Sequence, residues 1–587
     1  MRLNRPGPCI ALLPAILLAA SPPVPPGRGG TRLSITYPPA SLKTPFTRVR
    51  VAGSCEPSCR VTIAGRPARV YPTGAFVGLV PLEPGETTIE VAAERAGAKD
   101  RLALAVVCED PLVTSPASPP VAEQRMLMPA ADTVLQPGDE LRVQCKGSPG
   151  MRASWSLGKV VREAAMEEAP PLATDDGNEI RGIYRGAYRV QEGDRVSGGR
   201  VRFALRDALG RTARVRSSGR VTLLPRARLR RGVVGPDGAP ASAEPGGAQE
   251  WRLDAGTQIN LCGESGGNLR VLLASGMRCW VPERSVTLSK GEGGWPPSAV
   301  GAPAVERTPR GATVRIPASG APPARVSPGK APGELAVEIF GAAAFPRRAE
   351  AAGAGPVETA RIPATETDIL VAVVQLRNPA GWGYALRRTE EGIALDVKAP
   401  PGQRPGGVRV VIDPGHGGAH PGAVSPTGLR EKDVNLQVAR AAAAFLRRRG
   451  VRAVLTRDDD RTLSLPARVE RARREEADIF VSVHHDSCPG HCDPLARRGA
   501  ATYYGAPQSR GLATALLDRL GTVMAPPRGA RQAGFAVVVP ADYLAVLVEC
   551  GYLSHPEEEE RILGEGYARR AGRAIAEGVL GFAETAG

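Results

Sequence analysis

The chain has 587 residues, and at roughly 100–200 residues per domain this length predicts several domains. Hydrophobic residues make up 42% and charged residues 23%, which excludes a wholly disordered or fibrous protein. The formal net charge of +16 comes almost entirely from arginines spread along the chain. We therefore expect an anionic polymer outside the cell as a partner, and no nucleic acid.

Residues 1–21 are predicted to be a signal peptide. Arg2 and Arg5 precede the apolar run Cys9–Ala20, which is about as long as a signal core and too short to span a bilayer. No later apolar stretch reaches membrane length. We expect an exported protein, periplasmic or extracellular, with no transmembrane segment once the signal is removed.

Nine cysteines follow the predicted signal, and several are close together in the sequence. Close pairs in an exported protein favour disulfides. One cysteine, Cys550, lies in an apolar strand and is expected to be a buried thiol. The predicted disulfides are Cys55–Cys59, Cys262–Cys279, Cys488–Cys492 and Cys108–Cys145.

Short alternating strands between Gly- and Pro-rich turns occupy residues 33–400, which predicts a series of β-rich modules. The first resembles a bacterial immunoglobulin-like sandwich in pattern. The third, which contains Trp280, resembles an SH3-like barrel. Residues 109–120 and 291–310 are expected to be linkers. The modules are predicted at 33–108, 121–225, 226–290 and 312–400.

After residue 407 the pattern changes to continuous apolar runs separated by helical stripes. Such runs are typical of strands buried on both faces of a parallel sheet. One stripe joins Leu465, Val469 and Ala472. Residues 407–587 are therefore predicted to form an α/β domain with a mostly parallel sheet. Its helices are expected at 431–449, 464–477, 508–521 and 566–583.

All six histidines lie after residue 415, which points to a metal or acid–base site in this last domain. His416, His484 and Glu549 each come at or just after the end of a predicted strand, and Glu431 opens the first helix. The carboxyl ends of such strands share one edge of the sheet, where ligands bind. Two imidazoles and a carboxylate form a three-ligand zinc set with a free position for water, and a second glutamate is then the natural general base.

Residues 408–584 resemble the zinc-dependent N-acetylmuramoyl-L-alanine amidases of the bacterial cell wall. The resemblance implies one zinc ion held by His416, Glu431 and His484, with Glu549 as the catalytic glutamate. This chain has His485 where the family usually has Ala or Asn, so the choice between the two imidazoles stays open. The motifs that carry the resemblance are DPGHGG (413–418), GLREKDVNL (428–436), VLTRDDD (454–460), SVHHDS (482–487), AGFAVV (533–538) and LVECGYLS (547–554).

Several further residues are expected near this site. His485 is predicted to lie behind the ligands or to face the substrate, and Asp413 and Asp486 to orient ligands through hydrogen bonds. Arg531 is an alternative ion-pair partner for Glu549. Cys488, His491 and Cys492 read as a disulfide segment in preference to a second metal site, and His420 and His555 read as loop residues.

The resemblance implies a peptidoglycan hydrolase that cleaves the amide bond between N-acetylmuramic acid and L-alanine. The module at 312–400 resembles β-domains that precede such amidases and bind the wall, and the basic β-modules would contact anionic wall polymers. Three alternatives stay open at this point: a zinc peptidase of other wall peptides, a wall-binding protein with an inactive amidase domain, and an interaction scaffold in which the β-modules are the main function.

Overall fold

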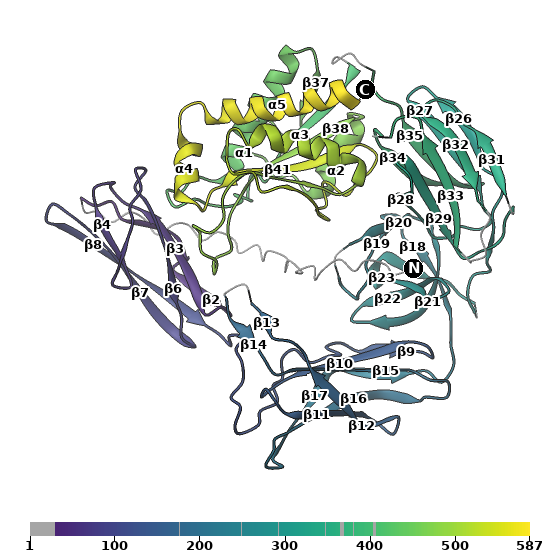
Figure 1. Cartoon of the computed structure of the whole chain (residues 1–587), viewed down its shortest axis with the longest axis horizontal. Coiled ribbons are helices and arrows are strands. Elements are labelled where there is room, and N and C mark those ends of the chain that lie inside the picture. The colour runs from purple at the N-terminus through teal and green to yellow at the C-terminus, as the bar shows by residue number, and fades with distance from the viewer. Residues whose placement is uncertain are drawn as a thin grey trace.

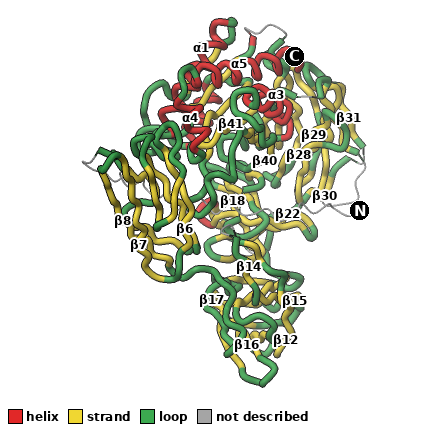
Figure 2. Tube along the Cα trace, turned by 60° about the vertical axis from the view of Figure 1, so that its left-hand side comes forward, coloured by secondary structure: helices red, strands yellow, loops and turns green. Residues whose placement is uncertain are grey.

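The computed structural model describes residues 30–174, 177–247, 249–291, 293–346, 348–363, 369–379, 381–402 and 407–586. The predicted signal peptide lies outside these residues. The β-rich part of the chain curves round, so that its first unit lies beside the C-terminal domain (Figure 1). Nearly all the helix gathers at that C-terminal end, while the rest of the chain is strand and loop (Figure 2). None of the described helices is long and apolar enough to cross a membrane.

The first β unit, residues 34–108, consists of two sheets around one apolar core. The sheets have the strand orders β1-β3-β6 and β2-β8-β7-β4-β5. All pairings are antiparallel except that of β2 with β8. The immunoglobulin-like class stays a prediction. The strands are β1 (Ser34–Tyr37), β2 (Ser41–Thr44), β3 (Arg48–Ser54), β4 (Arg60–Ile63), β5 (Arg66–Ala68), β6 (Ala75–Pro81), β7 (Gly85–Arg95) and β8 (Ala98–Cys108).

The second β unit has its own apolar core, which includes the buried Trp155 and Phe203. Its strand β9 pairs in parallel with β17 and antiparallel with β21 of the next unit, so one sheet runs through both units. The strands are β9 (Thr133–Leu135), β10 (Glu140–Lys146), β11 (Arg152–Leu157), β12 (Val161–Glu168), β13 (Leu172–Ala173), β14 (Glu179–Ile180), β15 (Ile183–Arg189), β16 (Val196–Arg206) and β17 (Thr212–Leu223).

The third β unit is small, with a core built mostly from β21, β22 and β23. The SH3-like class stays a prediction here too. The elements are β18 (Arg230–Val234), β19 (Ala239–Ala241), β20 (Trp251–Leu253), β21 (Gln258–Ser265), β22 (Asn268–Ala274), β23 (Met277–Pro282), the 3₁₀ turn η1 (Glu283–Ser285) and β24 (Val286–Leu288).

The fourth β unit has a four-stranded and a five-stranded sheet around a common core. The expected linker at 291–310 is wrong at its end, because residues 304–308 pair with β27. The strands are β25 (Ser298–Ala299), β26 (Ala304–Thr308), β27 (Gly311–Pro317), β28 (Ala324–Pro328), β29 (Glu334–Phe340), β30 (Ala342–Ala344), β31 (Ala349–Ala352), β32 (Val357–Ile362), β33 (Ile369–Leu376), β34 (Tyr384–Thr389) and β35 (Gly392–Lys398).

The α/β domain has a six-stranded mixed sheet in the order β37-β36-β38-β41-β39-β40. Four of its pairings are parallel and one, between β39 and β41, is antiparallel. The sheet is therefore mostly parallel, as expected, with one antiparallel pairing. The elements are β36 (Arg409–Pro414), α1 (Glu431–Arg448), β37 (Arg452–Leu455), α2 (Leu465–Arg474), β38 (Ile479–Asp486), β39 (Ala501–Tyr504), η3 (Pro507–Ser509), α3 (Arg510–Leu520), β40 (Ala530–Gln532), β41 (Leu544–Tyr552), α4 (Pro556–Leu563) and α5 (Tyr567–Ala586).

The strands of this sheet are apolar on both faces because helices or loops cover each face. Val481 and Val548 face the core formed with α1, α3 and α5, while their neighbours Phe480 and Leu547 face a second core that includes Ala472 of α2. The stripe expected on α2 is wrong at Leu465, which begins the helix and is 53% exposed. Helix α4 was not predicted, although a proline in its first turn and three early glutamates are typical of a helix start.

The fourth β unit packs against the α/β domain through Trp382, which is 1% exposed and belongs to the domain's core. Its indole N–H donates to the carbonyl of Ala586 at the end of α5 (3.0 Å). The N–H of Tyr384 donates to the carbonyl of Ala541 (2.7 Å). These contacts make the junction a packed interface.

All nine described cysteines are buried. The pairing Cys108–Cys145 is wrong, because the two residues lie in the cores of different β units. Cys55 and Cys59 share one core, and burial together with the neighbouring Cys59 raises the pKa of the Cys55 thiol to about 12. The other three pairs stay predictions. Cys550 is buried in the α/β core, as expected.

Candidate metal centre and active site

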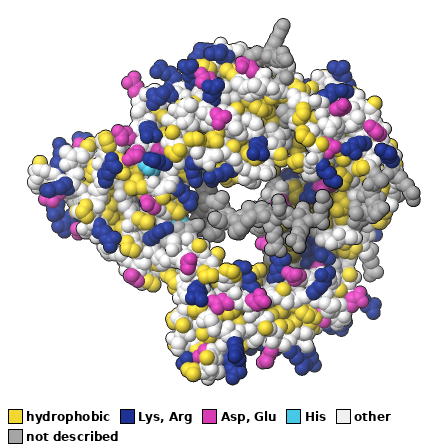
Figure 3. Space-filling view, viewed as in Figure 1, with side chains coloured by type: hydrophobic (Ala, Val, Ile, Leu, Met, Phe, Trp, Pro, Cys, Tyr) yellow, Lys and Arg dark blue, Asp and Glu magenta, His cyan; other side chains and the backbone are white. Residues whose placement is uncertain are grey.

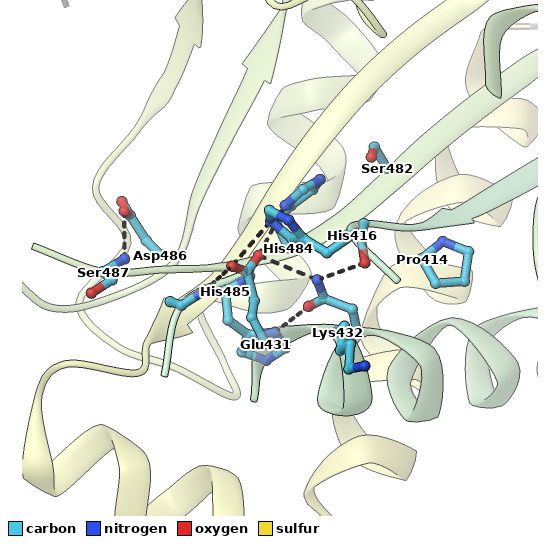
Figure 4. A network of polar contacts seen from close by, with 12 residues as sticks. Pro414, His416, Glu431, Lys432, Ser482, His484, His485, Asp486 and Ser487 are labelled. Atoms are coloured by element: carbon cyan, nitrogen blue, oxygen red, sulfur yellow. Dashed lines mark hydrogen bonds and ion pairs between the residues drawn. The ribbon is translucent and has the colours of Figure 1, made fainter. Parts of the chain in front are cut away.

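Three side chains from separate elements of the α/β domain converge on one point. His416 lies in the turn after β36, Glu431 is the first residue of α1, and His484 lies near the end of β38. Each offers one ligand atom, and these atoms lie within 4.8 Å of one another. Glu431 bridges the two rings, with Oε2 3.1 Å from His416 Nε2 and Oε1 2.9 Å from His484 Nδ1 (Figure 4).

The local backbone is shaped to let these groups approach. His416 itself has a positive φ of 60°, which turns the chain sharply after β36. At Gly415 a Cβ atom would lie 2.2 Å from the ring of His484, and at Gly422 it would lie 2.4 Å from Glu431 Oε2. Glycine at these two positions leaves the space in which the ligand side chains meet.

Asp413 and Arg468 hold the His416 turn from behind. Asp413 is fully buried, forms an ion pair with Arg468 (2.6 Å) and accepts a hydrogen bond from Ser482 Oγ (2.7 Å). Arg468 in turn donates to the backbone carbonyl of His416 (2.7 Å). Asp413 therefore supports the backbone of His416 through Arg468. The described contacts include no hydrogen bond between Asp413 and an imidazole.

The structure separates the two adjacent imidazoles. His485 is 1% exposed, and its ring lies between Asn435 of α1 and Tyr567 of α5. Burial lowers the pKa of His485 to about 4, so the ring is neutral. Its Nδ1–H donates to Asn435 Oδ1 (2.7 Å), while Asn435 Nδ2 donates to Glu431 Oε1 (3.2 Å). His485 thus lies behind Glu431, and His484 faces the ligand cluster.

Glu549 lies beside this cluster, on the neighbouring strand β41. Its Oε2 is buried with no hydrogen-bond partner among the described residues. Burial, assisted by the charges of Asp486 and Glu431, raises the pKa of Glu549 well above its usual value, and Arg528 opposes this shift. A carboxylate with a raised pKa and a free oxygen is suited to accept and return a proton.

Asp486 and two arginines lie at the outer edge of the site. Asp486 Oδ2 is 3.7 Å from Arg528 Nη1, and burial raises the pKa of Asp486 to about 6. Arg531, on β40, is exposed and donates to the carbonyl of Arg528 (3.1 Å). The described contacts do not pair Arg531 with Glu549. The sequence did not predict that Arg528 pairs with Asp486, because a lone arginine in a loop carries no sequence signal.

The remaining histidines lie away from the ligand cluster. His420 is exposed in the turn after His416. His555 is the N-cap residue of α4, where its Nδ1 accepts from the N–H of Glu557 (3.3 Å). His491 is buried and stacks on Phe46 of the first β unit (ring centroids 3.6 Å apart). The only group of three potential ligands found among the described residues is His416, Glu431 and His484.

The donor set fits a divalent metal ion. Burial opposes ionisation of Glu431, but hydrogen bonds and charge from His416 and His484 hold its pKa well below the usual value. An ionised carboxylate between two imidazoles offers a site for a cation, and metal binding there would release any proton held by the imidazoles. Two nitrogen ligands and one oxygen ligand are a set that zinc accepts.

The α/β domain is similar to known proteins. Residues 410–580 match the family described as N-acetylmuramoyl-L-alanine amidase. The amidase AmiC of Neisseria meningitidis is 33% identical over 245 residues, which cover 33% of this chain and 58% of that protein. The amidase AmiA of Escherichia coli is 30% identical over 231 residues, which cover 31% of this chain and 79% of that protein.

Among solved structures, the amidase AmiC2 of Nostoc punctiforme is 37% identical, with a TM-score of 0.29; the match covers 31% of this chain and 97% of that one. The family match at residues 410–580 lies within the α/β domain. Through residues 410–580, the chain belongs to the family of N-acetylmuramoyl-L-alanine amidases, enzymes that hydrolyse peptidoglycan.

Proposed function

We propose that this chain hydrolyses the amide bond between the lactyl group of N-acetylmuramic acid and the L-alanine of the stem peptide, with one zinc ion held by His416, Glu431 and His484. The convergence of these three ligands beside an unpartnered oxygen of Glu549 is the observation that carries the proposal. When bound, zinc polarises the scissile carbonyl and lowers the pKa of a water molecule.

The protein's own residues supply the proton transfers. Glu549 takes a proton from the attacking water as the new carbon–oxygen bond forms. It then gives that proton to the alanine nitrogen as the carbon–nitrogen bond breaks, which leaves a free lactyl carboxyl and a free amino group. Asp413 and Arg468 keep the His416 turn in place, while Asn435 and His485 fix the orientation of Glu431.

The test uses the full-length protein and purified peptidoglycan. We expect products with new muramic acid carboxyls and L-alanine amino ends, and no loss of cross-links between peptides. New ends at other peptide bonds would favour a zinc peptidase. Binding to the wall with no new ends would favour an inactive wall-binding protein.

The location and partners follow from this substrate. Peptidoglycan lies outside the cytoplasmic membrane, which supports export through the signal predicted at residues 1–21. Lysine and arginine side chains are scattered over the visible surface of the β units (Figure 3). This distribution supports weak, charge-dependent contact with anionic wall polymers over a broad surface.

A further inference from the structure

The first β unit contacts a loop that begins at the metal centre. Residues 487–493 follow directly after His484, His485 and Asp486 at the end of β38. The backbone N–H of Arg50, in β3, donates to the carbonyl of Gly490 (2.6 Å). Its guanidinium donates to the carbonyl of Cys488 (3.1 Å) and contacts Cys488 Sγ (3.4 Å). Arg50 is 6% exposed, so it is buried in this interface.

Other residues of the same unit surround Arg50 and complete the contact. The Arg50 guanidinium lies over the ring of Tyr37, 4.9 Å from its centre, and Arg48 Nε donates to the carbonyl of His491 (2.9 Å). The ring of Phe46 stacks on His491 at an angle of 22°. The fit at Gly490 is close, because a Cβ atom there would lie 1.8 Å from the Tyr37 hydroxyl.

The other side of the loop is tied to the strand that carries Glu549. The N–H of Cys488 donates to Ser554 Oγ (2.9 Å), and the N–H of Leu553 donates to the carbonyl of Asp486 (2.8 Å). Leu553 and Ser554 directly follow β41. The loop therefore bridges the ends of the strands that carry a metal ligand and the general base, and the first β unit packs on that bridge.

We propose that the first β unit, chiefly through Arg50, holds the 487–493 loop so that His484 and Glu549 keep their catalytic spacing. Arg50 is a positioning residue, and the first β unit is part of the catalytic assembly. This inference rests on the proposed amidase function. Small displacements of catalytic groups are costly, since a misplacement of about 1 Å can lower a rate by about 100-fold.

The test compares full-length Arg50→Ala with the wild-type chain on a soluble muropeptide, so that binding to insoluble wall does not limit the rate. We expect kcat to fall between about 10- and 100-fold while KM changes less than about threefold. Zinc content should stay at the wild-type level, and amide hydrogen exchange should quicken in residues 487–493.

The matched control is Arg69→Ala. Arg69 belongs to the same unit and lies 3.6 Å from Glu557 of α4, but its side chain is 69% exposed and it does not contact the loop in the described interactions. It should retain kcat within about twofold, because exposed ion pairs contribute little. Should Arg50→Ala fail to fold, Gly490→Ala tests the same contact from the catalytic side, with the same expected fall in kcat.

The possible outcomes distinguish the proposed amidase function from the proposed role of the first β unit. A wild-type chain that leaves the muropeptide intact would overturn the proposed function. Cleavage at equal rates by wild type and Arg50→Ala would overturn the role of the first β unit and leave the amidase function standing. A variant that loses zinc and activity together would also overturn it, since Arg50 would then act on metal binding instead of on spacing.

Discussion

His484 and Glu549 are direct neighbours across the parallel strands β38 and β41. The proposed metal ligand and the proposed general base are thus joined by the hydrogen-bond ladder of the sheet. Backbone pairing places the two groups side by side, but the pairing becomes irregular directly after them, between His484 and Asp486, so the spacing also depends on the loop that follows β38. Any change that disturbs the ends of these two strands is expected to lower the rate of catalysis.

Loss of a ligand imidazole should remove the metal. The full-length chain should bind about one zinc ion, and His416→Ala or His484→Ala should lose most of it, because two remaining ligands hold zinc poorly. Metal analysis after dialysis measures this. Zinc contents equal to wild type in both variants would disprove the ligand assignment.

The two glutamates should respond differently to the same substitution. Glu549→Gln keeps the shape of the side chain and removes the proton acceptor, so zinc should stay while amide cleavage falls by about 10²–10⁴-fold. Glu431→Gln should lose zinc and activity together. Metal analysis and cleavage rates on the same preparations test both. If Glu549→Gln loses its zinc, Glu549 is a ligand and not the base.

His485→Ala should destabilise the α/β domain without removing the metal. The change leaves Asn435 Oδ1 and the Tyr567 hydroxyl without their imidazole partner, at a cost of about 1–3 kcal/mol of unfolding free energy. Thermal unfolding with metal analysis measures the two effects. His420→Ala, an exposed site in the same domain, is the control and should leave both unchanged. Complete zinc loss in His485→Ala would assign the ligand role to the other imidazole.

Glu558 should make the domain less stable as the pH rises. Its two oxygens accept from the N–H groups of Gly499 and Tyr552 (both 2.7 Å), and burial raises its pKa from 4.5 to about 7. Between these values the folded state binds more protons than the unfolded state, so the free energy of unfolding falls as the pH rises from about 4.5 to about 7.

The pH prediction is tested by the slope of stability against pH. Glu558→Gln is expected to be less stable throughout, because one N–H loses its acceptor, but its stability should fall less steeply over this range. Thermal unfolding of the α/β domain within both full-length proteins, at several pH values, measures the slopes. Equal slopes would show that Glu558 is not the titrating group.

Binding to the wall should weaken as salt increases. The full-length chain with Glu549→Gln, which leaves the substrate intact, should sediment with insoluble wall at low salt and less at 0.5 M salt, because exposed charges are screened over about 8–10 Å at physiological ionic strength. Binding that does not change with salt would point to neutral sugar contacts in place of the proposed electrostatic ones.

Much of the catalytic domain could be predicted from local sequence. The continuous apolar runs predicted strands buried on both faces, and the residues at their ends predicted His416, His484, Glu431 and Glu549 at one edge. This succeeds because the carboxyl ends of parallel strands share an edge whatever the surrounding loops do. The strand and helix order of the domain followed from the same alternation, except that β40 and α4 were not predicted.

Other features depended on the tertiary structure. Successive side chains on a strand point to opposite sides, so only the register of β38 decides that His484 faces the ligands and His485 faces α1 and α5. The contact of Arg50 with Gly490 joins residues more than 400 positions apart, and in the sequence Arg50 looks like any other arginine of an exposed strand. Periodicity reports which face of an element is buried, whereas the partner that buries it is decided by the fold of the whole chain.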